Sequence, residues 1–260
     1  MRNDIKKLNK EHWSRNVPGL GRARELVAEI NKDFFDEVDA YRIRNEPYVV
    51  SLIEEFSREN GRILEVGCGL GADSRNFSRR GMRVVGLDLS LGNARLTKKG
   101  FECCGLDGNA ICSDAENLPF KDESFDGYYS FGVLHHTPDT AKAIDEAHRV
   151  LKKGKKCIVM LYHKGYAYLY INLLFGLKRL FVSEEKLISD HYDFTPLSKM
   201  YSKKTSAGLF YKFRKVEFEV TTFAFGGVDV NNKLRILHYL LKNPCLMNRL
   251  GQFLIIKAQK

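Results

Sequence analysis

Short apolar runs alternate with amphipathic stretches through the middle of this 260-residue chain. Five of the runs have the length and composition of buried strands and are bounded by turn-forming residues. They are Arg62–Val66, Arg83–Asp88, Ala110–Asp114, Phe125–Phe131 and Lys156–Tyr162. Between them, apolar residues at three-and-four spacing predict helices at Ala72–Arg80, Leu91–Lys99 and Thr140–Leu151. Strands that alternate with helices in this way predict a right-handed, mostly parallel α/β sheet.

Helical patterns precede this core. Apolar residues at helical spacing in Ala23–Phe34 and Pro47–Phe56 predict two helices, so we expect residues 1–60 to form a helical cap in front of a core at residues 61–162. Inside the core, the segment Lys152–Gly154 favours the end of a helix, because cations suit a helix C-terminus and glycine suits its left-handed cap.

The alternation stops after Tyr162. About fifty residues of helical or irregular sequence follow, and we interpret residues 163–215 as an insertion or lid. Two β-rich runs, Val216–Phe223 and Phe253–Ala258, then predict that residues 216–260 complete the core sheet. All these parts are expected to belong to one domain.

Composition places the chain among ordinary globular proteins, with 44% apolar and 28% charged residues. The net charge of +10 favours anionic partners such as phosphorylated metabolites, nucleic acid or an anionic membrane surface. The basic residues are scattered over short stretches and no nucleic-acid-binding motif is recognisable, so solvated basic faces are favoured over a nucleic-acid partner. The expected partner is a small-molecule substrate, anionic or amphipathic.

The six cysteines form no Cys-x-x-Cys pair and lie at no zinc-finger spacing, so we expect no metal. The charged segment Met1–Lys10 lacks the apolar core of a secretory signal, which predicts a cytoplasmic protein with reduced thiols. The uncharged stretch Gly165–Leu177 is too short to span a bilayer as a helix. It favours a buried lid or dimer helix, with a peripheral membrane contact as the alternative, so monomer and homodimer both stay open.

A glycine-rich loop follows the first strand. Gly67, Gly69 and Gly71 alternate with other residues between a strand and a helix, where only glycine permits a tight turn and a close approach of the backbone to a ligand. Such a loop is weak evidence by itself, because strand-to-helix turns also need glycine for structural reasons. Alone, it permits a nucleotide-binding interpretation and little more.

Two acidic residues restrict the class of ligand that this loop can bind. Asp88 ends the second strand, where its carboxylate can accept both hydroxyls of a ribose. Glu65 precedes the glycine loop, where an acid would repel the pyrophosphate of a dinucleotide. S-adenosylmethionine has no phosphate and carries an ammonium group. An acid at Glu65 therefore suits this cofactor better than NAD.

These residues resemble the first two motifs of the class I S-adenosylmethionine-dependent methyltransferases, in the branch of ubiquinone-, menaquinone- and other metabolite methyltransferases. Ser113–Phe120, Phe125–Asp139 and Ala143–Gly154 are similar to the motifs that follow in that family. The resemblance spans residues 60–162. It implies a Rossmann-like seven-stranded sheet, mostly parallel with an antiparallel last strand. It also implies methyl transfer to an O, N or C atom of a small metabolite by in-line displacement, with S-adenosylhomocysteine as product.

The resemblance implies a set of cofactor-binding residues. Asp114 would accept the adenine amino group, and the backbone amide of Ala115 would meet the ring. The full set is Glu65, Gly67, Cys68, Gly69, Gly71, Asp88, Leu89, Asp114, Ala115, Glu116, Ser130, Phe131 and Arg42.

Less specific similarities lie in the flanks. His12–Trp13, Glu46–Tyr48 and Pro196–Ser202 resemble segments that cover cofactor and substrate in one bacterial subgroup of these enzymes. Arg42 belongs to the same pattern and could bind the cofactor carboxylate, although an exposed helix arginine fits the sequence equally well.

Candidate bases lie on the acceptor side. The sulfonium is already activated, so a general base is needed only for a hydroxyl or a protonated amine acceptor. His135 and His136 follow the fourth strand and are the candidate catalytic residues, although packing within the loop explains them as well. The substrate-side candidates are His163, His191, Tyr192 and Tyr201.

Two other functions stay open at this point. A binding module could retain the fold and hold the cofactor without turnover, and an RNA-directed methyltransferase could use the positive charge. Ser130–Val133 stands where base-methylating enzymes carry an Asn- or Asp-Pro-Pro-Tyr motif, which argues against methylation of nucleic-acid bases. The sequence does not select the acceptor.

Overall fold

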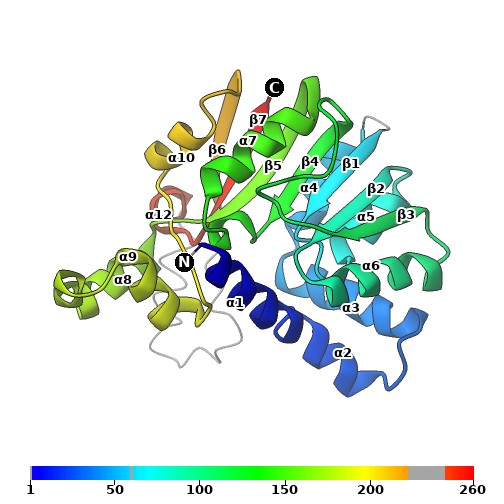
Figure 1. The fold of residues 1–260 in the computed structure, drawn as a ribbon, viewed down its shortest axis with the longest axis horizontal. Coiled ribbons are helices and arrows are strands. Elements are labelled where there is room, and N and C mark those ends of the chain that lie inside the picture. Colours follow the sequence, from blue (N-terminus) through cyan, green and yellow to red (C-terminus); the bar gives the residue numbers. More distant parts are fainter. Residues whose placement is uncertain (1, 59–60, 222–243) are drawn as a thin grey trace.

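The computed structural model describes residues 2–58, 61–221 and 244–260. Within them lies a seven-stranded sheet in the order β3-β2-β1-β4-β5-β7-β6 (Figure 1). Its strands are β1 Arg62–Val66, β2 Arg83–Asp88, β3 Gly108–Cys112, β4 Phe125–Phe131, β5 Leu151–Tyr162, β6 Lys215–Thr221 and β7 Phe253–Gln259. Strands β1 to β5 pair in parallel, whereas β7 runs antiparallel to both β5 and β6. The predicted fold class is confirmed.

The strand order reverses beside β1. This strand pairs with β2 on one side and with β4 on the other, so Glu65 faces Gly86 and Tyr129 across the two ladders. The connections that follow β1 and β4 leave the sheet in opposite directions, which opens a crevice at the carboxyl ends of the parallel strands. Glu65, near the end of β1, and Asp88, at the end of β2, lie beside this crevice.

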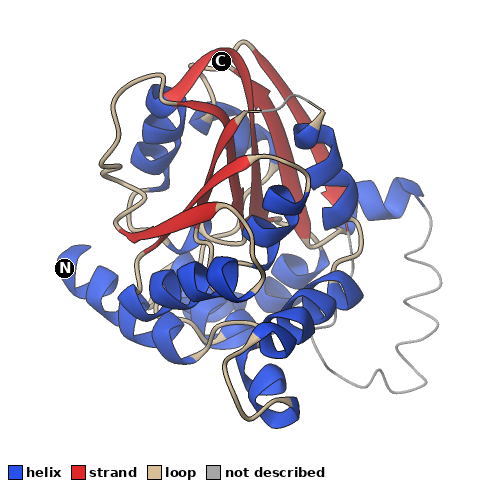
Figure 2. Ribbon diagram, turned by 90° about the vertical axis from the view of Figure 1, so that its right-hand side faces the viewer, coloured by secondary structure: helices blue, strands red, loops and turns tan. Residues whose placement is uncertain are grey.

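Helices cover both faces of the sheet (Figure 2). On one face, Ile53, Phe77 and Phe101 pack in one cluster with the strands. They belong to α4 Val49–Ser57, α5 Ala72–Arg79 and α6 Leu91–Cys103. On the other face, Ile144 and Phe210 pack with the sheet from α7 Thr140–Val150 and from the end of α10 Lys203–Leu209. Burial on both faces explains why the central strands are continuous apolar runs.

The N-terminal region forms α1 Arg2–Arg15, α2 Leu20–Leu26 and α3 Lys32–Asn45. The predicted single helix at Ala23–Phe34 is wrong, because the chain leaves helical geometry at Val27, where φ is −133°. Asn31 then caps α3 by accepting a hydrogen bond from the Phe34 N–H. The apolar residues of that window belong to two helices, and both helices contribute to one cluster.

Several strand boundaries also differ from the prediction, most clearly those of β3 and β5. β5 begins at Leu151 rather than Lys156, and its pairing with β4 shifts register between these two residues. The segment Lys152–Gly154 therefore belongs to the irregular start of β5, and Gly154 with φ of 73° lies there instead of at a helix end. β3 ends at Cys112, so Asp114 lies in the loop that follows.

The insertion contains α8 Tyr166–Phe175, η2 Gly176–Leu180, α9 Glu184–Ile188, η3 Ser189–Asp193 and α10, and α12 Pro244–Leu250 precedes β7. Figure 1 shows α8 and α9 as a projection at the side of the sheet layers. None of the helices within the described ranges is long and apolar enough to cross a membrane. The end of the predicted run Val216–Phe223 lies outside the described residues.

Candidate functional site

The glycine loop connects β1 to α5 at the crevice. Gly67, Gly69 and Gly71 have φ values of 80°, 54° and 76°. A Cβ atom at Gly67 would lie 2.1 Å from Cγ2 of Val133, and one at Gly71 would lie 2.7 Å from Cγ2 of Thr97. The loop therefore needs glycine both for its backbone conformation and for space.

Asp88 is buried at the end of β2, next to this loop. Its Oδ2 accepts a hydrogen bond from the Gly69 N–H at 2.9 Å, and its Oδ1 accepts hydrogen bonds from the Ser90 N–H at 2.8 Å and from Asn93 Nδ2 at 3.2 Å. Burial raises the pKa of Asp88 above its ordinary value, although these hydrogen bonds act in the opposite direction. Asp88 thus holds the loop against β2.

Glu65 is buried near the end of β1 among other charged groups. One of its oxygens accepts a hydrogen bond from Ser74 Oγ in the first turn of α5. Burial, together with the charge of Asp73, raises the pKa of Glu65 to about 8 against the opposing effects of Arg42 and Arg75. A cation placed beside this carboxyl group would favour its ionised form.

Asp114 and Glu116 share one cation from the N-terminal helix. Lys6 Nζ lies 2.5 Å from Asp114 Oδ2 and 2.6 Å from Glu116 Oε2. Burial raises the pKa of Asp114, but hydrogen bonds from Lys6 and from the Glu116 N–H outweigh burial and hold that pKa below its ordinary value. The residue expected to accept an adenine amino group therefore already accepts a hydrogen bond from an amine.

Helix α1 lies along the carboxyl edge of the sheet, which the sequence pattern did not reveal. Asn9 Nδ2 donates to the carbonyl of His136 at 2.6 Å, and the hydroxyls of Ser14 and Ser90 lie 2.7 Å apart. These contacts and Lys6 tie α1 to the ends of β2, β3 and β4. Apolar periodicity does not predict these contacts, because the contacts are polar. The available indication in the sequence was a set of polar residues at helical spacing.

Arg42 of α3 reaches the start of α5. Its Nε and Nη2 donate to the two carboxylate oxygens of Asp73 at 2.9 and 2.7 Å, and Tyr129 Oη donates to Asp73 Oδ2 at 3.0 Å. The guanidinium also pairs with Glu46 and lies 4.4 Å from the centre of the Phe131 ring. Two carboxylates of this chain thus neutralise Arg42, and its contact with a cofactor carboxylate stays a prediction.

Asp73 and Tyr129 are site residues that the sequence analysis did not single out. Tyr129 is fully buried in β4 with its hydroxyl on a buried carboxylate. The sequence did contain two indications of these residues: a tyrosine inside a buried strand and an acid directly after the glycine loop.

Other expected cofactor residues surround the same crevice. Ser130 is fully buried and its Oγ donates to the carbonyl of Val66 at 3.0 Å, which joins β4 to β1. Burial raises the pKa of the Cys68 thiol well above its ordinary value, so this cysteine acts as a small apolar residue. Ala115 is buried, and Leu89 is half-buried at the end of β2.

The histidine pair lies in the short helix η1, Leu134–His136, directly after β4. His135 is fully buried with its ring 3.8 Å from that of Tyr162, and neither ring nitrogen has a hydrogen-bond partner among the described residues. His136 Nδ1 lies 2.8 Å from the carbonyl oxygen of Leu197. Burial lowers the pKa of His136 to about 4 and that of His135 well below its ordinary value. Both imidazoles are therefore neutral near pH 7.

The substrate-side candidates lie in the insertion and at its start. The Tyr192 ring lies 5.1 Å from that of Tyr162. His163 and Tyr201 form a bridge, and Tyr201 Oη donates to Thr140 Oγ1 at 2.9 Å. His191 instead stacks on Phe175 of α8, with ring centres 3.8 Å apart. Among the described residues, no group of three or more His, Cys, Asp or Glu could hold a metal ion.

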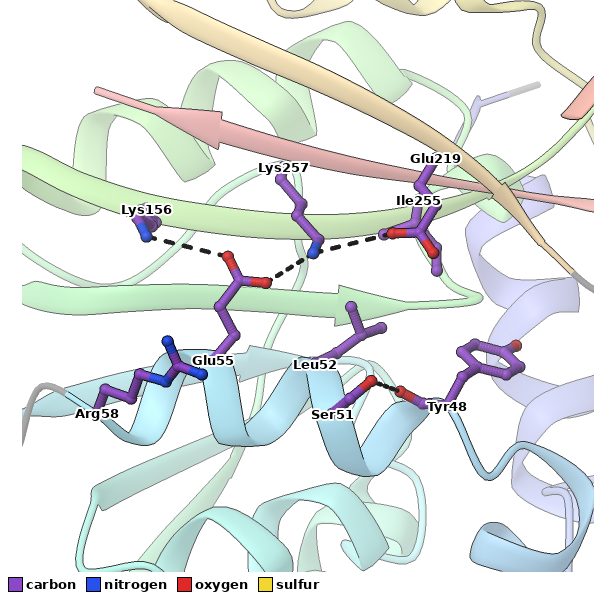
Figure 3. Close-up of a pocket in the computed structure, with 9 residues that line it drawn as sticks. All are labelled: Tyr48, Ser51, Leu52, Glu55, Arg58, Lys156, Glu219, Ile255 and Lys257. Atoms are coloured by element: carbon purple, nitrogen blue, oxygen red, sulfur yellow. Dashed lines mark hydrogen bonds and ion pairs between the residues drawn. The ribbon is translucent and has the colours of Figure 1, made fainter.

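A cavity of about 380 Å³ lies between α4 and the sheet (Figure 3). It is lined by Tyr48, Ser51, Leu52, Glu55, Arg58, Lys156, Glu219, Ile255 and Lys257. Its two acids pair with one of its lysines, since Lys257 Nζ lies 2.6 Å from Glu55 Oε2 and 3.9 Å from Glu219 Oε2. None of the acids of the glycine loop contributes to this cavity, so we do not assign it to the functional site.

Comparison with known proteins identifies the core. Residues 64–159 match the sequence family described as a methyltransferase domain. The core of this chain is a class I methyltransferase domain. The matched residues include the glycine loop, Asp88, Asp114 and the histidine pair, whereas α1, Arg42 and the tyrosines from Tyr162 onward lie outside the match.

Relatives with an assigned activity share this core. The chain is 38% identical over 104 residues to a demethylmenaquinone methyltransferase of Streptomyces avermitilis, which covers 40% of this chain and 43% of the relative. It is 36% identical over 122 residues to a 24-methylenesterol C-methyltransferase of Arabidopsis thaliana, with 45% and 32% covered. The chain spans 31% to 64% of the length of the first curated relatives that it matches.

A solved structure supports the fold over a longer span. Phosphoethanolamine N-methyltransferase 2 of Haemonchus contortus, in complex with S-adenosyl-L-methionine, superimposes with a TM-score of 0.59 at 18% identity. The match covers 90% of this chain and 60% of that chain. At this identity the likeness concerns the fold, and it extends well beyond the matched domain.

Proposed function

We propose that this chain is an S-adenosylmethionine-dependent methyltransferase that methylates an O, N or C atom of a small molecule. The observation that carries the proposal is the position of Glu65, Asp88 and Asp114 at or just beyond the carboxyl ends of three neighbouring strands, with Asp88 hydrogen-bonded to the glycine loop. Packing alone does not require three acids there, because a buried carboxylate costs free energy unless it meets a partner. The methyltransferase names of the relatives support the same activity.

Each acid has its own part in holding the cofactor. Glu65 would pair with the ammonium group, Asp88 would accept the ribose hydroxyls beside Gly69, and Asp114 would accept the adenine amino group. The contact between Lys6 and Asp114 supports this assignment, because an N–H donor from outside the core already reaches that carboxylate. The cofactor supplies the activated methyl group, so the protein contributes chiefly binding and orientation.

The acceptor would lie beside His135. A fully buried imidazole without a partner among the described residues costs free energy, unless a ligand or water completes its hydrogen bonds. Its lowered pKa keeps the ring neutral, so one nitrogen can accept a hydrogen bond from a hydroxyl or amine of the acceptor. Weak basicity favours a role in orienting the acceptor over a role in removing its proton.

The acceptor we propose is amphipathic. Tyr162 lies between His135 and the rings of Tyr192 and Phe253, and Phe253 also contacts Phe131. These rings form an aromatic wall on the acceptor side, which suits a flat or isoprenoid-bearing molecule with one polar group. The demethylmenaquinone and methylenesterol in the names of two relatives are molecules of this class.

Thermal unfolding with S-adenosylhomocysteine tests the cofactor directly. A ligand at a hundred times its Kd stabilises a folded protein by about 2.7 kcal/mol, so we expect a clear rise in Tm. NAD should give no rise, because Glu65 offers a pyrophosphate no positive charge and would repel it once ionised. A folded chain whose Tm does not respond to S-adenosylhomocysteine would contradict the proposal.

An Asp88→Ala variant tests the site assignment. Loss of a buried carboxylate that holds the loop and the ribose should weaken S-adenosylhomocysteine binding by at least about a hundredfold. Asp107→Ala is the matched control, because Asp107 is exposed in the turn before β3. Equal affinities of the two variants in isothermal titration would refute the role of Asp88.

Turnover separates an enzyme from a binding module. Incubation of the chain with S-adenosylmethionine and a panel of quinol, sterol and phosphoethanolamine acceptors should release S-adenosylhomocysteine with one class. Binding of the cofactor without release for any acceptor would favour the binding module.

A further inference from the structure

The segment Gly165–Ser183, which we call the arm, exposes many large apolar side chains. It comprises α8, η2 and the turn that follows. The exposed fractions are 84% for Leu173, 84% for Leu177, 78% for Leu180 and 88% for Phe181. Apolar residues gathered in this way on a protein surface mark an interaction site, whereas single exposed ones need no explanation.

The arm is nevertheless a packed element. Ala167 and Ile171 on α8 are buried in one cluster with Leu187 and Ile188 of α9. The helix therefore buries one apolar side against the protein and presents a second apolar side to the outside, where Leu169 is also exposed. Figure 1 shows the projection of α8 and α9 from the sheet layers.

The charges of the arm favour a membrane over a second copy of the chain as its partner. Lys178 and Arg179 are the only charged residues in Gly165–Ser183, and the whole chain carries a net charge of +10. Lys178 is exposed between Leu177 and Leu180. The acids that follow the arm include Glu184 and Asp190, which pair with Lys164 and Lys186. Apolar residues flanked by cations fit the interface of an anionic membrane. A second copy of the chain would instead bring the same cations together across a two-fold axis.

We infer that the arm docks on an anionic membrane and inserts Leu177, Leu180 and Phe181 into the headgroup region. Ring contacts run from this surface to the acceptor side. Phe175 stacks on His191, the next residue Tyr192 contacts Tyr162, and Tyr162 contacts His135. If the proposed function holds, a docked enzyme therefore presents its acceptor side next to the lipid surface.

Co-sedimentation of the full chain with vesicles tests the inference. We expect binding to vesicles of phosphatidylcholine with phosphatidylglycerol, weaker binding to phosphatidylcholine alone, and weaker binding at high salt. The double variant Leu177→Asp/Phe181→Asp should lower the partition coefficient at least about tenfold, since it removes apolar area and adds repulsive charge. Lys178→Glu/Arg179→Glu should lower binding to the anionic vesicles alone.

The matched control removes two exposed apolar residues elsewhere. Leu26, at the end of α2, is 50% exposed, and Ile30, after α2, is 44% exposed. Leu26→Asp/Ile30→Asp should leave vesicle binding unchanged. Absence of wild-type binding to the anionic vesicles, or an equal loss in both double variants, would overturn the inference. A wild-type dimer in analytical ultracentrifugation that Leu177→Asp/Phe181→Asp dissociates would overturn it in favour of a second copy.

Thermal shifts with S-adenosylhomocysteine on the same samples test the proposed function separately from membrane docking. Unchanged shifts in the arm variants show that the variants are folded. Vesicle binding by a chain that does not respond to S-adenosylhomocysteine would uphold membrane docking and contradict the proposed function.

Discussion

The two halves of the crevice differ in how their polar groups are satisfied. On the cofactor side, Asp88 accepts three hydrogen bonds, and Lys6 pairs with Asp114 and Glu116. On the acceptor side, His135 is equally buried, yet neither of its ring nitrogens has a partner within the described ranges. The first half is preorganised by the protein itself. The second contains buried ring nitrogens without a partner in the described ranges, and the proposed function assigns them to the acceptor.

The largest effect should come from breaking the preorganised half. In Gly67→Ala the new methyl group meets Val133 at 2.1 Å and the residue must keep a φ of 80°. Overpacking and left-handed strain together should destabilise the fold by about 3 kcal/mol, measured by urea unfolding. Gly105→Ala is the control for strain alone, since its φ is 62° and its added Cβ meets nothing within 4 Å. It should cost about 1 kcal/mol. Equal losses of stability in the two variants would mean that the loop can accommodate a methyl group at Gly67.

The second effect is a pH dependence set by Glu65. Its pKa of about 8 keeps the carboxyl group protonated at pH 7 without cofactor, whereas an ammonium group requires the ionised form. Binding therefore releases a proton, and the affinity for S-adenosylhomocysteine should rise by up to about tenfold per pH unit below about pH 8 and then level off. Titration calorimetry in buffers of different ionisation enthalpy measures this proton.

Glu65 also affects stability in the absence of cofactor. The unfolded chain releases the proton near the ordinary pKa of 4.5, so the contribution of Glu65 to stability falls as pH rises from there to about 8. Glu65→Gln is the control and should bind more weakly with this pH dependence removed. A wild-type affinity that does not change with pH would contradict the pairing of Glu65 with the ammonium group.

A smaller effect should follow from removing Lys6. If this amine competes with the adenine amino group for Asp114, Lys6→Met should tighten S-adenosylhomocysteine binding by about threefold to tenfold. The reason is that Lys6 no longer occupies Asp114 in a fraction of the protein molecules. Lys7→Met is the control, since Lys7 is exposed on the same helix. Weaker binding in Lys6→Met would instead make Lys6 part of the adenine pocket.

The same contrast governs what the sequence could predict. β1, β2 and β4 were predicted with their observed bounds, because each is a mostly apolar run bounded by polar or glycine residues. Glu65 and Asp88 could be named for the same reason, because they lie near the ends of β1 and β2. The predicted helix Ala23–Phe34 failed, since helical periodicity does not distinguish one helix from two short helices that share a core.

The polar contacts between distant segments of the fold could not be predicted from the sequence. The position of Lys6 on Asp114 joins residues 108 positions apart, and Arg42 on Asp73 joins residues 31 apart. Such pairs follow from how α1 and α3 dock, which a local pattern does not encode. The start of β5 was missed because Leu151 lies directly beyond the C-terminal turn of α7, where cations and glycine also suit a helix end.

The smallest effect bears most directly on the acceptor side. His135→Phe keeps a ring of similar size beside Tyr162 and removes two buried polar nitrogens, so urea unfolding should show a gain of about 1 kcal/mol. His136→Phe is the matched control and should lose about 1 kcal/mol, because it removes the hydrogen bond to the Leu197 carbonyl. Equal losses would mean that His135 is a structural residue with a partner. A stabilised His135→Phe that binds S-adenosylhomocysteine normally but no longer turns over would mean that the imidazole is retained for the acceptor at the expense of stability.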